Sequence, residues 1–462
     1  MNSRFTQSLV SYWQQAGSRF LPFADVATKD LPLSRLLRLS LFQISVGMAM
    51  VLLVGTLNRV MIVELKVPAA LVSIMVALPL VFAPLRALIG FRSDNHRSAL
   101  GWRRVPYMWM GTLLQFGGLA IMPFALLVLA RAGQSAQAPL WVGYLGAGGA
   151  FLLVGAGLHT TQTVGLALAT DLVPEKSQPK VVGLMYVMLM LGMITSALLF
   201  GWLLADYSPG RLIQVIQGAG LATLVINVIA LWKQEPRDNS RYLRQAPALG
   251  FTESWALLCK SRFAIRRLVA IGLGTMAFTM GDVLLEPYGG EILNLAVGAT
   301  TSLTATLAVG GLLGFCIASK ILSDGADPFR MATAGALIGL PAFILIIMAA
   351  PLNSTLLFAS GIFLIGLGGG LFSHGTLTST MNYAPPNQSG LALGAWGAVQ
   401  ASATGVGVGL GGVIRDMVAS SSGPTNGYVA VYTCELALLV AAILVMLPML
   451  RISVSAPKPQ YN

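Results

Sequence analysis

The sequence predicts an all-α polytopic membrane protein with 12 transmembrane helices, arranged as two parallel six-helix repeats. Three observations predict this fold class: the composition, the number of apolar runs, and a pattern that recurs between the two halves. Of the 462 residues, 55% are hydrophobic and only 10% are charged. A soluble domain averages about 25% charged residues, so this chain is expected to fold within lipid.

Twelve apolar runs each approach the ~20 residues that a helix needs to cross a ~30 Å hydrocarbon core. They lie at about residues 36–60, 69–90, 105–130, 140–169, 181–205, 210–232, 265–287, 298–322, 330–350, 354–380, 388–414 and 428–450. In the arm before them, residues 1–35, Phe5, Leu9 and Tyr12 recur at helical spacing. This spacing predicts a short amphipathic helix at the membrane surface, with a loosely ordered arm as an equal alternative.

The basic residues predict the orientation of the helices, because short cytoplasmic loops carry an excess of Lys and Arg. With the N-terminus inside, all but five of the 29 basic residues fall on the cytoplasmic side. The five on the other side are Arg59, Lys66, Arg131, Arg211 and Arg415. Both termini are therefore expected in the cytoplasm. The net charge of +12 follows the loops and forms no basic patch of the kind that binds nucleic acid.

One long hydrophilic stretch, residues 233–264, divides the apolar runs into two sets of six. It is expected to be a cytoplasmic linker between an N-terminal six-helix bundle (36–232) and a C-terminal six-helix bundle (265–450). Residues 451–462 then form a cytoplasmic tail.

The two halves also match each other in sequence. Residues 65–69 (LKVPA) match residues 295–299 (LAVGA) at a shift of 230 residues, and the same shift carries Asp94 onto Asp324. Parallel repeats related by an axis along the membrane normal are the architecture of the major facilitator fold. The sequence therefore predicts that fold.

Residues 90–106 (GFRSDNHRSALGWRRVP), between the second and third runs, resemble in expanded form the signature loop of the major facilitator superfamily. The matching residues are Gly90, Asp94, Arg97, Gly101, Arg103 and Arg104. The loop departs from the family pattern at Asn95, where a basic residue is usual, and in the extra residues before Gly101. An ordinary loop that follows the positive-inside rule is the alternative.

The sequence contains none of the common short signatures of enzymes. The Gly-x-x-x-x-Gly-Lys-Ser/Thr, His-Glu-x-x-His and Gly-x-Ser-x-Gly patterns do not occur. The 3 histidines are scattered, and the 3 cysteines, Cys259, Cys316 and Cys434, show no metal-ligand spacing. The chain is therefore expected to be neither an enzyme nor a holder of a free metal ion.

Several long stretches resemble one family, the PucC/LhaA-type light-harvesting complex assembly proteins of purple phototrophic bacteria. These proteins form the bacteriochlorophyll-delivery branch of the major facilitator superfamily. The stretches are residues 33–65, 71–129, 171–193 and 284–290 (LLEPYGG). The resemblance runs over nearly all of residues 33–450 and is strongest in the first half.

The resemblance implies a factor that builds antenna complexes and hands bacteriochlorophyll to the light-harvesting α and β polypeptides. It also implies contact with the reaction-centre core complex and with membrane lipid, in the bacterial inner (photosynthetic intracytoplasmic) membrane. Two other hypotheses remain open. One is a proton-coupled exporter of a small molecule, and the other is a structural subunit of the reaction-centre core without a ligand of its own.

Two histidines lie within predicted spans, His159 in the fourth and His374 in the tenth. Polar residues at this depth are costly and are functional candidates by default. An imidazole can serve as axial ligand to the magnesium of a chlorin, so both are candidate bacteriochlorophyll ligands. Hydrogen bonding within the bundle is the favoured alternative, for His159 with Thr160, Thr161 or Thr163.

Asp282 and Glu286 lie four residues apart and therefore share one face of the predicted seventh helix. A proton-coupled transporter needs a carboxylate that changes protonation inside a cavity, and this pair is the best candidate. A proline and two glycines follow at once, which favours a helix end with a partly solvated, interfacial pair. Arg59 and Glu64 are likewise expected at the interface, and Glu435 at the start of the twelfth helix.

The eleventh run is rich in glycine, with a bare face formed by Gly394, Gly397, Gly405, Gly407, Gly409, Gly411 and Gly412. Glycines in a membrane helix favour close backbone contact with a neighbouring helix. Helix packing is the favoured interpretation, and a groove for a flat ligand such as a tetrapyrrole is the alternative.

Overall fold

A computed structural model describes residues 32–81, 89, 93, 102–173, 178–235, 263–382 and 389–455. The described residues form helices and connecting turns, without strands. Eleven helical stretches among them are long and apolar enough to cross a membrane. The predicted second span is described over Ala69–Val81 and at Ile89, and its remaining residues lie outside the described part. The prediction of an all-α polytopic membrane protein is confirmed.

The helices of the N-terminal half follow the predicted spans closely. They are α2 (Leu33–Met50), η2 (Val51–Leu57), η3 (Val60–Glu64), α3 (Ala69–Val81), α5 (Val105–Leu129), η4 (Gly133–Gln137), α6 (Leu140–Asp171), α7 (Gln178–Leu203) and α8 (Pro209–Leu231). The first span continues from α2 through two π-helical segments to Glu64, beyond its predicted end at residue 60. Lys66, with a φ of 54°, and then Pro68 end this helical stretch.

The helices of the C-terminal half differ most from the predictions in the seventh span, and α15 and α16 also extend beyond their predicted ends. They are α10 (Ala264–Thr279), α11 (Asp282–Glu291), α12 (Val297–Ser323), α13 (Pro328–Ala349), α14 (Thr355–Asn382), α15 (Ser389–Ser422) and α16 (Pro424–Ser455). The predicted seventh helix is broken between α10 and α11, at Met280 and Gly281. Pro287 lies inside α11, which ends at Glu291 directly after Gly289 and Gly290, four residues beyond the predicted end near residue 287.

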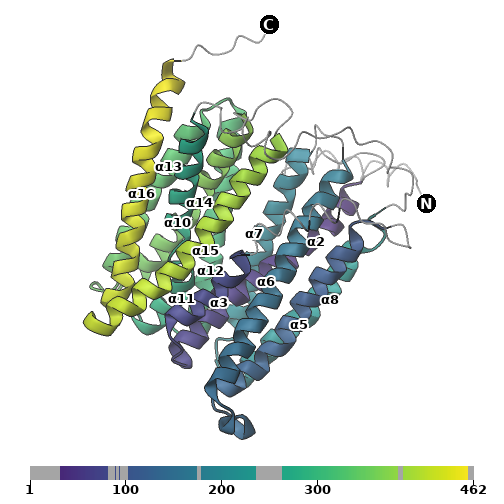
Figure 1. Cartoon of the computed structure of the whole chain (residues 1–462), viewed down its shortest axis with the longest axis vertical. Helices are drawn as coiled ribbons and strands as arrows, with labels where there is room; N and C mark the ends of the chain where they lie inside the picture. Colours follow the sequence, from purple (N-terminus) through teal and green to yellow (C-terminus); the bar gives the residue numbers. More distant parts are fainter. Residues whose placement is uncertain are drawn as a thin grey trace, which may run out of the picture.

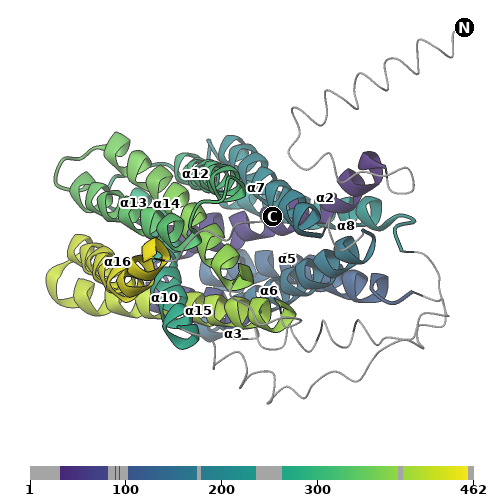
Figure 2. The same ribbon diagram turned by 90° about the horizontal axis from the view of Figure 1, so that it is seen from above.

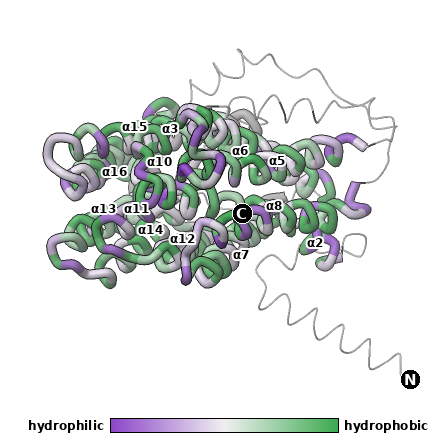
Figure 3. The backbone as a smooth tube through the Cα atoms, turned by 90° about the horizontal axis from the view of Figure 1, so that it is seen from below, coloured by the Kyte–Doolittle hydropathy of each residue, from purple (hydrophilic) through white to green (hydrophobic). Residues whose placement is uncertain are grey.

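The two halves lie side by side with their long helices roughly parallel (Figure 1). Seen from above, α7 lies beside α12 and α3 lies beside α15, so these two pairs join the halves (Figure 2). Hydrophobic residues cover most of the length of the helices (Figure 3). This distribution agrees with helices that face lipid or each other rather than water.

Small residues set the close approach of helices from different halves. A Cβ atom at Gly298 in α12 would lie 2.9 Å from the backbone nitrogen of Ala205, just after α7, and would collide with the carbonyl of Gly201. In α15, Cβ atoms at Gly411 and Gly412 would collide with α10–α11 and with α3. The interpretation of these two glycines as packing residues is confirmed.

The surroundings of Gly394 lie outside the described part, and a Cβ atom added at Gly397 would meet no atom of another helix within 4 Å. The N-terminal arm (1–31) and most of the linker (236–262) also lie outside it, so the helix expected in the arm stays a prediction.

Candidate functional site

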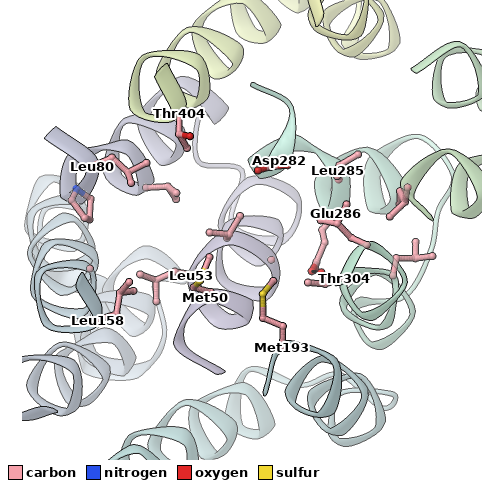
Figure 4. A pocket seen from close by; sticks show the side chains of 18 of the residues that line it. Met50, Leu53, Leu80, Leu158, Met193, Asp282, Leu285, Glu286, Thr304 and Thr404 are labelled. Atoms are coloured by element: carbon pink, nitrogen blue, oxygen red, sulfur yellow. Dashed lines mark hydrogen bonds between the residues drawn. The ribbon is translucent and has the colours of Figure 1, made fainter. Parts of the chain in front are cut away.

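A cavity of about 200 Å³ lies between the two halves (Figure 4). Helices of both halves line it: α2–η2, α3, α6 and α7 from the first, and α11, α12, α14 and α15 from the second. Most of the lining is apolar, with Met50, Leu53, Leu158 and Met193 among its residues. Its polar side chains are His159, Asp282, Glu286, Thr304 and Thr404.

The two carboxyl groups predicted to share a helix face do so, one turn apart on α11 (Figure 4). Both line the cavity. Glu286 is 4% exposed and accepts hydrogen bonds from Thr304 (2.5 Å) and Thr301 (3.3 Å). The prediction of a solvated, interfacial pair is therefore wrong for Glu286. Because α11 continues past Pro287, its acidic face lies inside the bundle rather than at its edge.

Gly55 in the first span makes room for the Glu286 carboxylate. A Cβ atom at this position would collide with Oε1 of Glu286 and would lie 3.2 Å from Oγ1 of Thr304. Beside it, the Nδ2 atom of Asn58 donates to the carbonyl oxygen of Val283 at 2.8 Å. The first span near its π-helical segment and the broken seventh span thus contact each other directly beside the cavity. Short π-helical segments are frequent at functional sites.

The break between α10 and α11 is held by a third acidic residue. Glu435 accepts a hydrogen bond from the backbone N–H of Gly281 at 2.6 Å through Oε1. Its side chain is 1% exposed and lies well inside α16, which begins at Pro424. The prediction that Glu435 begins the twelfth helix is therefore wrong, because the helix starts eleven residues earlier at Pro424.

The two candidate histidines lie in different places. His159 in α6 lines the cavity, whereas His374 in α14 is not part of its lining and packs edge-on against Phe315 with ring centroids 5.3 Å apart. Thr160 donates to the carbonyl of Ala156, and Thr161 accepts from Gln115, so both hydroxyls have partners other than His159. Pigment ligation by either histidine stays a prediction.

Beyond the cavity, at the end of the first span, polar groups join the halves. Arg59 pairs with Glu64 and donates to the carbonyl of Leu295 at 3.0 Å. The side chain of Arg59 is 4% exposed and that of Glu64 is 37% exposed, so Arg59 is buried within the protein. Their position at the membrane interface stays a prediction. Asp416 in α15 accepts from the backbone N–H of Ala70 at 2.7 Å, at the start of α3.

Arg415 belongs to the same end of the molecule. It pairs with Glu291 and with Asp416, and Tyr428 donates to Glu291 at 2.8 Å. Arg415 was predicted as one of the five external basic residues, and no pattern in the sequence indicated a role for Asp416 or Glu291. Four polar or charged residues from three separate stretches of the chain meet here, so only their contacts in space identify the group.

Two arginines of the predicted signature loop form a polar cluster at the opposite end of the N-terminal half. Arg103 and Arg104 both pair with Asp171, at 2.6 and 3.0 Å. The carboxylate of Glu235 accepts from the backbone N–H groups of Arg103, Arg104 and Val105, where α5 begins. The remaining signature residues Gly90, Asp94, Arg97 and Gly101 lie outside the described residues.

The cavity can bind or transfer a proton and can hold a small ligand with an apolar body. Within the part of the chain that the structure describes, no group of three or more His, Cys, Asp or Glu side chains could hold a metal ion. Clefts for drug-sized ligands usually enclose about 300–1,000 Å³. At about 200 Å³, this cavity is smaller than such clefts.

Among solved structures, the chain is similar to a bacterial homologue of the human lysosomal transporter Spinster, solved in an inward-facing, unoccupied conformation. The TM-score is 0.67, with 14% sequence identity, and the match covers 92% of this chain and 98% of that one. At this identity the likeness shows the fold alone, which is that of the major facilitator transporters.

Proteins of known sequence resemble this chain much more closely. It is 62% identical over 419 residues to Protein PucC of Rhodovulum sulfidophilum, covering 90% of this chain and 92% of the relative. It is 57% identical over 442 residues to Protein PucC of Rhodobacter capsulatus, covering 94% of this chain and 96% of the relative. The family model described as PUCC protein matches residues 56–454. This multi-pass membrane protein therefore belongs to the PUCC protein family.

Proposed function

We propose that this protein is a non-enzymatic assembly factor for bacterial light-harvesting antenna complexes, which binds bacteriochlorophyll or delivers it to antenna polypeptides. Membership of the PUCC family is the observation that carries the proposal. The chain itself is a PUCC-family membrane protein with the major facilitator fold.

The residues that line the cavity favour an apolar ligand over a hydrated one. A sugar or an ion needs several polar groups to replace the water that it leaves behind. Of the residues that line the cavity, only Asp282 and Glu286 are acidic, and Lys and Arg do not occur among them. The cavity therefore suits a largely apolar molecule with one polar group better than a hydrated solute.

The size of the cavity limits how a pigment would be handled. A tetrapyrrole with its tail is larger than a drug-sized ligand, and the cavity is smaller than the clefts that such ligands occupy. In this conformation the cavity does not fit an intact bacteriochlorophyll. Pigment contact is therefore expected on the membrane-facing surface of the helices and not inside the cavity.

The proposal includes partners and a location. The partners are the light-harvesting α and β polypeptides and the reaction-centre core complex, in addition to membrane lipid. The location is the bacterial inner membrane, with both termini in the cytoplasm. Fusions of a cytoplasmic and of a periplasmic reporter to the C-terminus test the orientation, because only the cytoplasmic reporter should be active.

Deletion of the gene in a phototrophic host that carries it tests the function. We expect lower antenna absorbance and a lower yield of antenna complexes, both restored by the intact chain. An Asp282→Asn chain should also restore them, because pigment handling outside the cavity does not use this carboxylate. Unchanged antenna absorbance and complex yield in the deletion strain would contradict the proposal.

Gentle purification of the protein gives an independent test. An absorbance spectrum with bacteriochlorophyll bands, together with antenna polypeptides among the co-purified proteins, would support pigment handling. Stoichiometric core complex without pigment would instead favour a structural subunit of the reaction-centre core.

A second candidate function is a proton-coupled exporter of a small molecule. The specific observation in its favour is the pair Asp282 and Glu286 on the wall of a cavity between the two halves of a transporter fold. Carboxyl groups in such a cavity are functional candidates by default. Flux driven by a pH gradient in proteoliposomes, lost in both Asp282→Asn and Glu286→Gln, would favour this function over the first.

A further inference from the structure

The break in the seventh span leaves backbone groups without helical partners inside the bundle. α10 ends at Thr279 and α11 begins at Asp282, so the first N–H groups of α11 have no acceptor within the helix. One donor at the break, the N–H of Gly281, is bound by Oε1 of Glu435 at 2.6 Å. The other carboxyl oxygen of Glu435, Oε2, is buried without a hydrogen-bond partner among the described residues.

Among the described residues, Glu435 forms no ion pair that would balance the charge of a carboxylate. From α11 comes Asp282, the residue directly after Gly281, whose backbone N–H Glu435 binds. From its own helix comes Tyr432, which is fully buried with no hydrogen-bond partner for its hydroxyl among the described residues. The ring of Phe343 from α13 stacks against Tyr432, with the ring centroids 6.4 Å apart.

Two of the described buried arginines already have acidic partners. Arg415, from α15, pairs with Glu291 and Asp416 and contacts Tyr428. Arg59, from the first span, pairs with Glu64. An unbalanced carboxylate in an apolar interior is so costly that the group takes up a proton instead. The unpartnered Oε2 atom of Glu435 is where that proton would reside.

We propose that Glu435 and Asp282 form a proton-binding site at the break between α10 and α11, which exchanges protons with the cavity through Asp282. Asp282 lines the cavity, whereas Glu435 does not. A proton passes from water in the cavity to the Asp282 carboxylate and from there to Oε2 of Glu435, and it leaves by the reverse route. The net charge of the pair then changes by one for each proton, without any other bond being formed or broken.

Proton loading alters how firmly α11 is held. A carboxylate binds a backbone N–H more strongly than a neutral carboxyl group does, since hydrogen bonds to ionised groups are about twice as strong. Release of the proton therefore tightens the contact between Glu435 and Gly281. Leu285 and Glu286, on the same helix, form part of the cavity wall, so the wall follows the protonation state of Glu435. This inference deepens the exporter function and does not depend on the antenna function.

Infrared difference spectroscopy during a pH change tests the site in the intact, purified protein. Protonated carboxyl groups give a C=O stretching band at a higher frequency than the bands of carboxylates and amides. Glu435→Gln should remove one component of this band, and the amide oxygen can still accept from Gly281. Glu435→Asp should keep a protonated-carboxyl component, and Asp282→Asn should slow the exchange of the remaining one. The exposed carboxylate of Asp206 supplies the control, because Asp206→Asn should leave the band unchanged.

Two results would overturn the proposal. The first is a band and titration that are the same in Glu435→Gln, in Asp282→Asn and in the unmodified protein. The second is a band component lost in Glu435→Gln with exchange kinetics unaffected by Asp282→Asn, which would remove Asp282 as the route to the cavity. Neither result bears on antenna absorbance in the host, so failure of this inference is distinguishable from failure of the antenna function.

Hydrogen exchange of the backbone gives a second readout at the break itself. Glu435→Leu, which cannot accept a hydrogen bond, should speed exchange at Gly281 by about tenfold or more. Glu435→Gln should have a smaller effect at the same amide. Equal exchange at Gly281 in both variants and in the unmodified protein would show that Glu435 does not hold the break.

Discussion

Removal of the Glu235 side chain should loosen the start of α5. In Glu235→Ala, three consecutive backbone N–H groups, those of Arg103, Arg104 and Val105, lose an acceptor that lies 2.9 Å away. Hydrogen bonds to a charged group contribute about 1.5–3 kcal/mol. A negative charge at a helix N-terminus adds about 0.3–1 kcal/mol. Because Glu235 is partly exposed, we expect a local loss of about 2 kcal/mol.

A local loss of about 2 kcal/mol corresponds to about 30-fold faster opening, since about 1.4 kcal/mol is a factor of ten. Hydrogen exchange measured by mass spectrometry on peptides that contain Arg103–Val105 reports this opening. Glu235→Gln keeps one acceptor oxygen without the charge and should speed exchange by about fivefold, or about 1 kcal/mol.

The matched control is Asp206→Ala, which removes an exposed carboxylate outside this cluster and should leave the peptide unchanged. If Glu235→Ala and Asp206→Ala gave the same exchange at these amides, the capping role of Glu235 would be refuted.

Three further predictions concern the contacts between the halves and the chemistry at their ends. Gly298→Leu should destabilise the α7–α12 contact by about 1–3 kcal/mol or more, because the added side chain overpacks it. Gly218→Leu should not, because an added Cβ atom at Gly218 meets nothing within 4 Å. Thermal unfolding in detergent compares the two variants. Arg59→Gln should lower the free energy of unfolding by about 1–3 kcal/mol, because it removes a buried guanidinium that binds Glu64 and the carbonyl of Leu295 in the other half. A midpoint of thermal unfolding equal to that of the unmodified protein would contradict this. Burial, with a smaller contribution from the charge of Glu64, raises the pKa of Tyr207 above its usual value. Glu64→Gln should therefore lower the pH at which the absorbance of the Tyr207 tyrosinate appears. Tyr207→Phe identifies the part of the absorbance that belongs to this residue.

The helices were largely predictable because each apolar run meets a physical requirement by itself. A segment that crosses lipid must satisfy its backbone groups internally, so about 20 apolar residues in a row predict a helix wherever they occur. α5 (Val105–Leu129) agrees with the run predicted at 105–130 to within one residue. The fold class followed from the number of such runs and from the repeat between the halves.

The candidate site was predicted only in part. The spacing of four residues between Asp282 and Glu286 was enough to place them on one helix face, since this depends on helix geometry alone. How deep these carboxyl groups lie in the bundle was not predictable from their spacing. Pro287 suggested the end of a helix, but it lies in the first turns of α11, a helix that begins after a break. That break depends on Gly281 and on Glu435, which is 154 residues away in the sequence.

Sequence by itself determined that this chain is a helical membrane protein, which runs of residues form its helices, and which family it resembles. These features rest on local composition and on matching stretches, and neither requires knowledge of which helices touch. The tertiary structure alone decided that Arg59, Glu286 and Glu435 are buried, that His159 faces the cavity while His374 does not, and that Glu235 caps α5. Burial and pairing are properties of contacts between distant segments, so they become visible only when the helices are packed together.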